Sequence, residues 1–183
     1  MKRFFGWMVA AVLMLSAVCA AGAEGVTFKT NYFTLQLPDG WITDYEDLEK
    51  EEGLEGLGFF GQDAKIGLIA GAYLVYYEDL KDVALWSSDS EEMKAYIEAI
   101  LEDFKDDHPE YLDTVMAGKI PIILIKATDA EGEYLYADTM TNGYAIQIEA
   151  YVADDSDEEK LYPLTEENIE QFKSILATFV PVT

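Results

Sequence analysis

The chain of 183 residues is poor in basic side chains and has no arginine after Arg3. It carries 12 Lys and Arg residues against 36 Asp and Glu residues, a formal net charge of −24. Nucleic-acid binding depends on basic side chains that neutralise phosphates, and anionic lipid head groups require the same residues. We therefore expect no nucleic-acid partner and expect cations, basic peptides or basic protein surfaces instead. An acidic excess also keeps an exported protein in solution without any specific role.

Cysteine and histidine occur once each, as Cys19 and His108. Zinc sites normally draw on several such ligands, so a zinc centre is not expected. The same scarcity excludes Cys–His and Ser–His–Asp catalysis unless His108 is the base, and no serine lies in a G-x-S-x-G motif. Paired carboxylates could cleave glycosides, but no pair stands out among so many acids. We predict a protein that is not an enzyme.

The first residues have the pattern of a secretory signal peptide. Lys2 and Arg3 precede the apolar run 4–15, and Ala21-Gly22-Ala23 fits the A-x-A cleavage pattern. The apolar run is shorter than the roughly 20 residues that span a bilayer. We predict that residues 1–23 are removed, with no stable membrane insertion afterwards, and that the mature protein is periplasmic or secreted.

Lipid anchoring at Cys19 is the alternative, although Val18 stands where lipid attachment needs a small residue. Cleavage after Ala23 would leave no cysteine, so that the core alone stabilises an exported protein. Residues 24–183 have the size of a single domain. Their net charge is about −26, because Lys2 and Arg3 are lost and residues 1–23 hold no acid.

Short strands account for most of the mature sequence. Phe33, Leu35 and Leu37 alternate with polar residues, which predicts a strand with one buried face. Pro38-Asp39-Gly40 ends that strand and places Trp41 at its edge. An irregular acidic segment is expected after Trp41, then a glycine-rich loop and a strand of small residues. Further strands are predicted over 26–29, 65–77, 113–117, 120–128, 133–141 and, after the Asn142-Gly143 hairpin pair, from 144.

Two amphipathic helices are predicted. Ser88 and Glu91 have the spacing of a capping box for the first, which should fade before Pro109. Thr165 caps the second. Their apolar stripes are Met93, Ile97, Ile100 and Phe104 in the first helix, and Ile169, Phe172, Ile175, Leu176 and Phe179 in the second.

Tyrosines are abundant in the predicted sheet. They are Tyr73, Tyr76, Tyr77, Tyr134, Tyr136, Tyr144 and Tyr151. Their rings can pack inside while the hydroxyls reach a polar edge, and we expect this packing role. The alternative is an aromatic face that binds a partner.

Four acids in one charged segment are the candidate metal ligands: Asp154, Asp155, Asp157 and Glu159. Counted from Asp155 as a calcium loop, Glu166 falls at the twelfth position, but Lys160 stands at the sixth, where glycine is needed. The segment is therefore not an EF-hand and is expected to be a solvated loop with at most a weak calcium contact. A second cation-binding candidate is the group from Asp106 to Glu110, which contains His108. No other cofactor is expected.

Phe33-x-Leu35-x-Leu37-Pro38-x-Gly40-Trp41, with the ending Ile175-Leu176-Ala177-Thr178-Phe179, resembles the PsbP-like family. This group includes the extrinsic PsbP protein of photosystem II, DcrB-type bacterial envelope proteins and a Ran-binding import factor. The resemblance covers most of residues 26–180. It implies an α+β fold with a mostly antiparallel sheet flanked by helices in an α/β/α sandwich.

Members of that group are mostly binding or assembly proteins without a shared set of catalytic residues. The resemblance therefore carries over no active site. Together with the acidic charge, it leads us to expect an exported, non-catalytic accessory or binding protein of the bacterial cell envelope. Its partner would be an envelope protein or a basic peptide that meets an acidic surface. The alternative is a calcium-binding protein that uses carboxylates.

Overall fold

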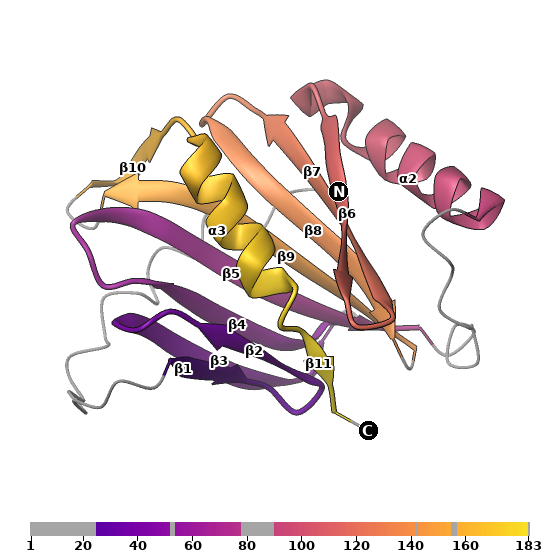
Figure 1. Ribbon diagram of the computed structural model, residues 1–183, viewed down its shortest axis with the longest axis horizontal. Helices are drawn as coiled ribbons and strands as arrows, with labels where there is room; N and C mark the ends of the chain where they lie inside the picture. The colour runs from indigo at the N-terminus through magenta and orange to yellow at the C-terminus, as the bar shows by residue number, and fades with distance from the viewer. Residues whose placement is uncertain (1–24, 52–53, 78–89, 142, 155–156, 183) are drawn as a thin grey trace.

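The computed structural model describes residues 25–51, 54–77, 90–141, 143–154 and 157–182 (Figure 1). Within these ranges eleven strands form two antiparallel sheets. The strands are β1 (Val26–Lys29), β2 (Phe33–Leu37), β3 (Trp41–Glu51), β4 (Leu54–Gln62), β5 (Ile66–Tyr76), β6 (Glu110–Ala117), β7 (Ile120–Thr128), β8 (Glu133–Thr141), β9 (Tyr144–Asp154), β10 (Asp157–Tyr162) and β11 (Val180–Pro181).

The large sheet has eight strands in the order β3-β4-β5-β9-β8-β7-β6, with β10 paired to β9. The small sheet has the order β1-β2-β11 and joins the two ends of the described chain. The strands predicted over 26–29, 32–37 and 65–77 are confirmed as β1, β2 and β5. Strand β5 lies between β4 and β9 within the large sheet.

The expected α/β/α sandwich is wrong. The described residues contain two α-helices, α2 (Glu91–Asp103) and α3 (Glu166–Leu176), and most of the remaining residues are in strands. The small sheet packs on the same side of the large sheet as α3, and Figure 1 shows both in front of it. The layer that covers this face of the large sheet therefore consists of α3 together with a second sheet, and the fold is β-rich.

Two segments that were expected to be wholly or partly irregular also belong to the large sheet. The acidic stretch after Trp41 is β3, and the glycine-rich stretch that follows is β4. A Cβ at Gly58 would lie 2.5 Å from the Phe28 ring, so glycine is needed there for the small sheet to approach. Acids and glycines have low strand propensity, and the sequence pattern therefore concealed both strands.

The end of β2 agrees with the prediction. Leu35, Leu37 and Trp41 are buried, and Gly40 turns the chain with φ +77°, a conformation that favours glycine. The indole of Trp41 stacks on Phe60 with ring centroids 6.2 Å apart. This stretch therefore connects the small sheet to the core of the large one.

Both predicted helices are present, with one difference at a cap. The amide of Met93 donates to Ser90 Oγ over 3.1 Å, so Ser90 and not Ser88 caps α2, while Ser88 lies outside the described residues. Thr165 caps α3 as predicted, and Asn168 completes the capping box. None of the helices in the described ranges has the length and apolar character required to cross a lipid bilayer.

The two faces of the large sheet differ in composition. The apolar face carries Leu68, Leu74, Ile122, Leu124, Leu135, Ile146 and Ile148, and packs against α3 and the small sheet. The tyrosine face carries Ile123, Ile125, Tyr134, Tyr136 and Tyr151, and packs against Met93 and Ile100 of α2. The period of two along each strand assigns alternate residues to the two faces.

Candidate functional site

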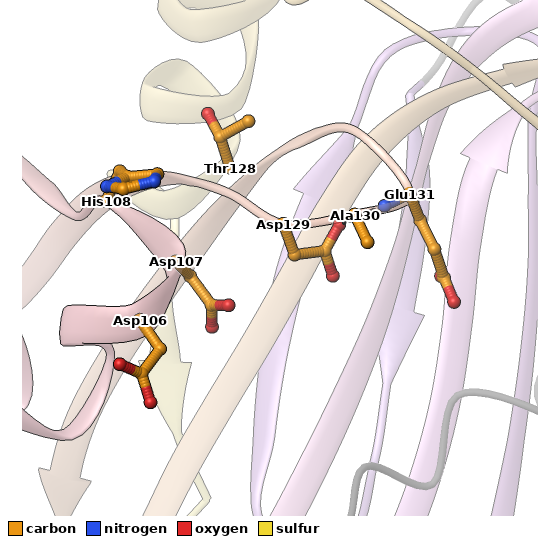
Figure 2. Close-up of a pocket in the computed structure, with 7 residues that line it drawn as sticks. All are labelled: Asp106, Asp107, His108, Thr128, Asp129, Ala130 and Glu131. Atoms are coloured by element: carbon orange, nitrogen blue, oxygen red, sulfur yellow. Dashed lines mark hydrogen bonds between the residues drawn. The ribbon is translucent and has the colours of Figure 1, made fainter.

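An acidic hollow lies where the end of α2 approaches the turn between β7 and β8 (Figure 2). It has a volume of about 620 Å³. Its lining residues are Asp106, Asp107, His108, Thr128, Asp129, Ala130 and Glu131. Four carboxylates and no lysine thus belong to the described lining.

The chain after α2 forms one wall of this hollow. Helix α2 is followed by a short 3₁₀ turn, η3 (Lys105–Asp107), and then by His108 in the left-handed conformation with φ 50° and ψ 57°. That conformation costs a non-glycine residue of the order of 1 kcal/mol. It reverses the chain so that Pro109 leads into β6, which leaves Asp106 and Asp107 at the rim of the hollow.

The turn between β7 and β8 forms the opposite wall. Asp129 Oδ1 accepts the amide N–H groups of Glu131 at 2.8 Å and Gly132 at 3.0 Å. The Asp129 amide in turn donates to the Gly132 carbonyl over 3.0 Å. These bonds close a turn over residues 129–132, which holds Glu131 exposed beside the hollow.

The position of the hollow adds to its negative potential. The C-terminal end of a helix carries a partial negative charge; the last turn of α2 has no basic residue, and Lys105, which follows in η3, pairs with Glu102. In the view of Figure 2, the carboxylates of Asp106 and Asp107 in η3 and of Asp129 and Glu131 in the β7–β8 turn all point to the lower side of the picture. This arrangement favours a cationic group over an anionic one.

A buried polar cluster lies farther along the tyrosine face and ties α2 to the sheet. Tyr96 of α2 donates its hydroxyl to Asp138 Oδ1 over 2.6 Å. Tyr136 donates to Asp138 Oδ2 over 2.9 Å, and Gln147 Nε2 donates to the same oxygen over 3.3 Å. Asp138 is 2% exposed, so three neutral donors hold a carboxyl group that is removed from water. We call these four residues the Asp138 cluster.

Burial shifts the pKa values in this cluster. Desolvation raises the pKa of Asp138, while the three donated hydrogen bonds act in the opposite direction. Burial also raises the pKa of Tyr96 and of Tyr136, and the negative charge of Asp138 adds to both shifts. The two hydroxyls therefore stay protonated over the whole neutral range and remain hydrogen-bond donors.

Ring contacts connect the Asp138 cluster to the acidic hollow. Phe104, the C-cap of α2, lies 4.6 Å from Tyr136 and 6.4 Å from Tyr134 between ring centroids. Tyr134 donates its hydroxyl to Asp107 Oδ2 at 3.1 Å. A continuous set of contacts thus runs from the buried carboxyl to a wall of the hollow.

The residues predicted to bind calcium are placed differently from the expectation. Asp154 ends β9 and pairs with Asp157 of β10, so the segment is a hairpin and not a solvated loop. Asp154 is buried and accepts a hydrogen bond from the Tyr162 hydroxyl over 3.3 Å. Asp155 and the side chains of Asp157 and Glu159 lie outside the described residues, and calcium binding there stays a prediction.

The described part of the chain holds no group of three or more His, Cys, Asp or Glu side chains arranged to bind a metal ion. The second candidate group is divided: Asp106, Asp107 and His108 line the hollow, whereas Glu110 begins β6.

Sequence reasoning missed Asp129, Glu131 and Asp138 as site residues. The first two were seen only as a turn. The signal for Asp138 was a single acid in an apolar strand, two residues from Tyr136 and therefore on the same face. Of the seven tyrosines, Tyr134, Tyr136 and Tyr151 are buried, Tyr73, Tyr76 and Tyr144 are half-buried, and Tyr77 is exposed, so the expected packing role holds for six of them.

Comparison with models of protein families found no match, and comparison with curated proteins found no relative. The resemblance to PsbP-like proteins therefore remains a prediction from the sequence.

Proposed function

We propose that this is an exported, non-catalytic binding protein of the bacterial cell envelope that engages a basic peptide or a basic surface of another envelope protein. The acidic hollow is the observation that carries the proposal. It has a volume of about 620 Å³, is lined by four carboxylates and lies at the negative end of a helix. A lysine or arginine side chain entering the hollow would meet several carboxylates from two walls.

The charge of the whole chain supports the same partner. With 36 acids against 12 basic residues, long-range attraction would speed the approach of a basic partner. Screening by salt should weaken such binding, since the Debye length is about 8 Å at physiological ionic strength.

A calorimetric titration with an eight-residue lysine peptide at low salt tests this proposal. We expect binding that weakens as salt is added. The variant Asp106→Asn with Glu131→Gln changes two exposed carboxylates of the hollow and should weaken binding about tenfold, since two lost charge contacts cost roughly 1.4 kcal/mol together.

The matched control is Asp39→Asn with Asp63→Gln, which removes the same charge from two exposed turns away from the hollow. It should weaken binding by less than about twofold, because it alters only the long-range field. Equal loss in both variants would show that net charge, and not the hollow, attracts the peptide. No binding at low salt, together with no partner recovered from envelope extract, would refute the proposal.

A further inference from the structure

The Asp138 cluster contains a buried carboxyl group that has no cation as a partner among the described residues and no role in the proposed function. A carboxyl group that is 2% exposed joins an α-helix to the sheet, and its three hydrogen-bond donors are all uncharged. No lysine in the described part of the chain forms an ion pair with it. Burying an ionised carboxylate without a cation costs several kcal/mol, which hydrogen bonds offset only in part.

We propose that Asp138 is a proton-operated clasp, in which uptake of one proton from solvent by the buried carboxyl group tightens the docking of α2 on the tyrosine face. Protonation removes the buried charge and its desolvation cost. The hydrogen bond between Asp138 and Tyr96 can persist after protonation, because a tyrosine hydroxyl both donates and accepts. The new carboxyl O–H can donate to Tyr96 Oη while Tyr136 and Gln147 continue to donate to the other oxygen.

The residues that surround Asp138 are consistent with docking of α2 that tightens on protonation. Helix α2 contributes Tyr96 among apolar residues, and β8 contributes Tyr136. The register places Gln147 of β9 and Ile123 of β7 directly beside Asp138. Neither neighbouring strand therefore brings a positive charge to the carboxyl group.

The next positions outward are also neutral or acidic. Glu149 of β9 pairs with Tyr136, and Tyr73 of β5 pairs with Gln147. Tyr77, just after β5, lies close enough to Tyr96 that its phenolate form would raise the pKa of Tyr96. The negative charge of Glu149 adds to the raised pKa of Tyr136, which keeps this hydroxyl protonated as a donor to Asp138.

The sign of the pH dependence follows from linkage. Burial raises the pKa of Asp138 in the docked state, whereas release of α2 would return it towards the usual aspartate value. The docked state then holds more protons, so docking is strongest below the usual value and weakens as pH rises through the raised pKa. Between the two values the opening equilibrium changes by up to about tenfold per pH unit.

The clasp also bears on the hollow, because η3 continues α2 and carries Asp106 and Asp107. A tighter α2 would fix one wall of the binding surface. This consequence rests on the proposed function. The clasp itself does not, since it concerns only the attachment of the helix.

Amide hydrogen exchange of residues 91–104, corrected for the intrinsic effect of pH, tests the clasp without any ligand. We expect protection of α2 in the wild-type chain to rise as pH falls through the raised pKa of Asp138 towards the usual aspartate value. Asp138→Asn should abolish this response and give protection at neutral pH equal to or above wild type. Glu92→Gln, on the exposed side of the same helix, should behave as wild type.

A second measurement keeps the test valid even where Asp138→Asn fails to fold. The side-chain carboxyl carbon of Asp138 can be followed by nuclear magnetic resonance in the wild-type chain. Titration clearly above the usual aspartate value of about 3.9 supports the clasp. Titration at or below that value overturns it, as does an α2 pH response that persists in Asp138→Asn. Failure of both peptide binding and partner recovery, with both clasp results intact, would refute only the proposed function.

Discussion

The apolar face and the tyrosine face of the large sheet each receive one α-helix, but different contacts hold the two helices. Helix α3 buries Phe172, Ile175 and Leu176 in a cluster built from hydrocarbon side chains. Helix α2 buries only Met93 and Ile100 and adds the bond from Tyr96 to a buried carboxyl group. Apolar burial is non-directional and insensitive to pH, whereas the Asp138 cluster is directional and titratable.

The acidic hollow lies at the end of α2 and not at the end of α3. The apolar face therefore provides the stability on which the fold depends. The tyrosine face positions the helix whose end forms a wall of the hollow. The predictions below test this contrast.

The largest effect is expected on the apolar face. Trp41→Ala removes an indole that is 6% exposed and stacked on Phe60, and should lower the free energy of unfolding by about 3–5 kcal/mol in urea denaturation. Ile42→Ala, next in the chain and 38% exposed, should cost about 0.5 kcal/mol. Unchanged stability with loss of peptide binding would make Trp41 a recognition residue.

A smaller effect is expected in the Asp138 cluster. Tyr96→Phe keeps the ring but removes one donor from the buried carboxyl group, and should lower the free energy of unfolding by about 1–3 kcal/mol. Tyr111→Phe removes a hydroxyl that is bonded to Thr114 on the exposed β6, and should change stability by at most about 0.5 kcal/mol. Equal effects of the two variants would show that the Tyr96 bond does not stabilise α2 docking.

A carboxyl group near the rim of the apolar face should show the opposite pH dependence to Asp138. A hydrogen bond from Lys126 lowers the pKa of Glu133, and the Leu164 amide adds to the shift. Its stabilising effect is therefore present above the usual glutamate pKa and is lost as pH falls through the lowered value.

Glu133→Gln should accordingly cost about 1 kcal/mol at neutral pH, because the pair is partly exposed, and the difference from wild type should shrink towards about pH 4. Denaturation curves at several pH values measure it. A difference that stays constant with pH would contradict the assigned cause.

The smallest effect is expected from calcium. The sequence predicts weak binding by Asp154, Asp155, Asp157 and Glu159, which at a calcium concentration equal to a Kd of about 1 mM would add about 0.4 kcal/mol of stability. Thermal denaturation with and without calcium measures it. The same shift with magnesium, or in Asp157→Asn with Glu159→Gln, would indicate general charge screening instead of a site.

Regular alternation and caps made much of the fold predictable from sequence. The polar–apolar pattern of 33–37 and the cap at Thr165 each correspond to an element. Strands β3 and β4 were hard to predict, because acids and glycines have low strand propensity and the glycines of β4 answer to contacts from elsewhere in the fold. Gly58, for example, makes room for Phe28 of the other sheet.

The site was predictable only in part, for a similar reason. Asp106, Asp107 and His108 are consecutive, so the sequence showed them together. Asp129 and Glu131 join them only because the β7–β8 turn reaches the end of α2. Asp138 meets Tyr96 from a helix 42 positions earlier in the chain, a contact that local patterns do not contain.

The central claim is that the acidic hollow at the end of the tyrosine face is the binding surface. A nuclear magnetic resonance titration of the wild-type chain with the eight-residue lysine peptide tests it most directly. The account predicts that amide shifts concentrate in residues 105–110 and 128–132. Shifts spread evenly over the exposed acids, or concentrated around α3 and the small sheet, would contradict it.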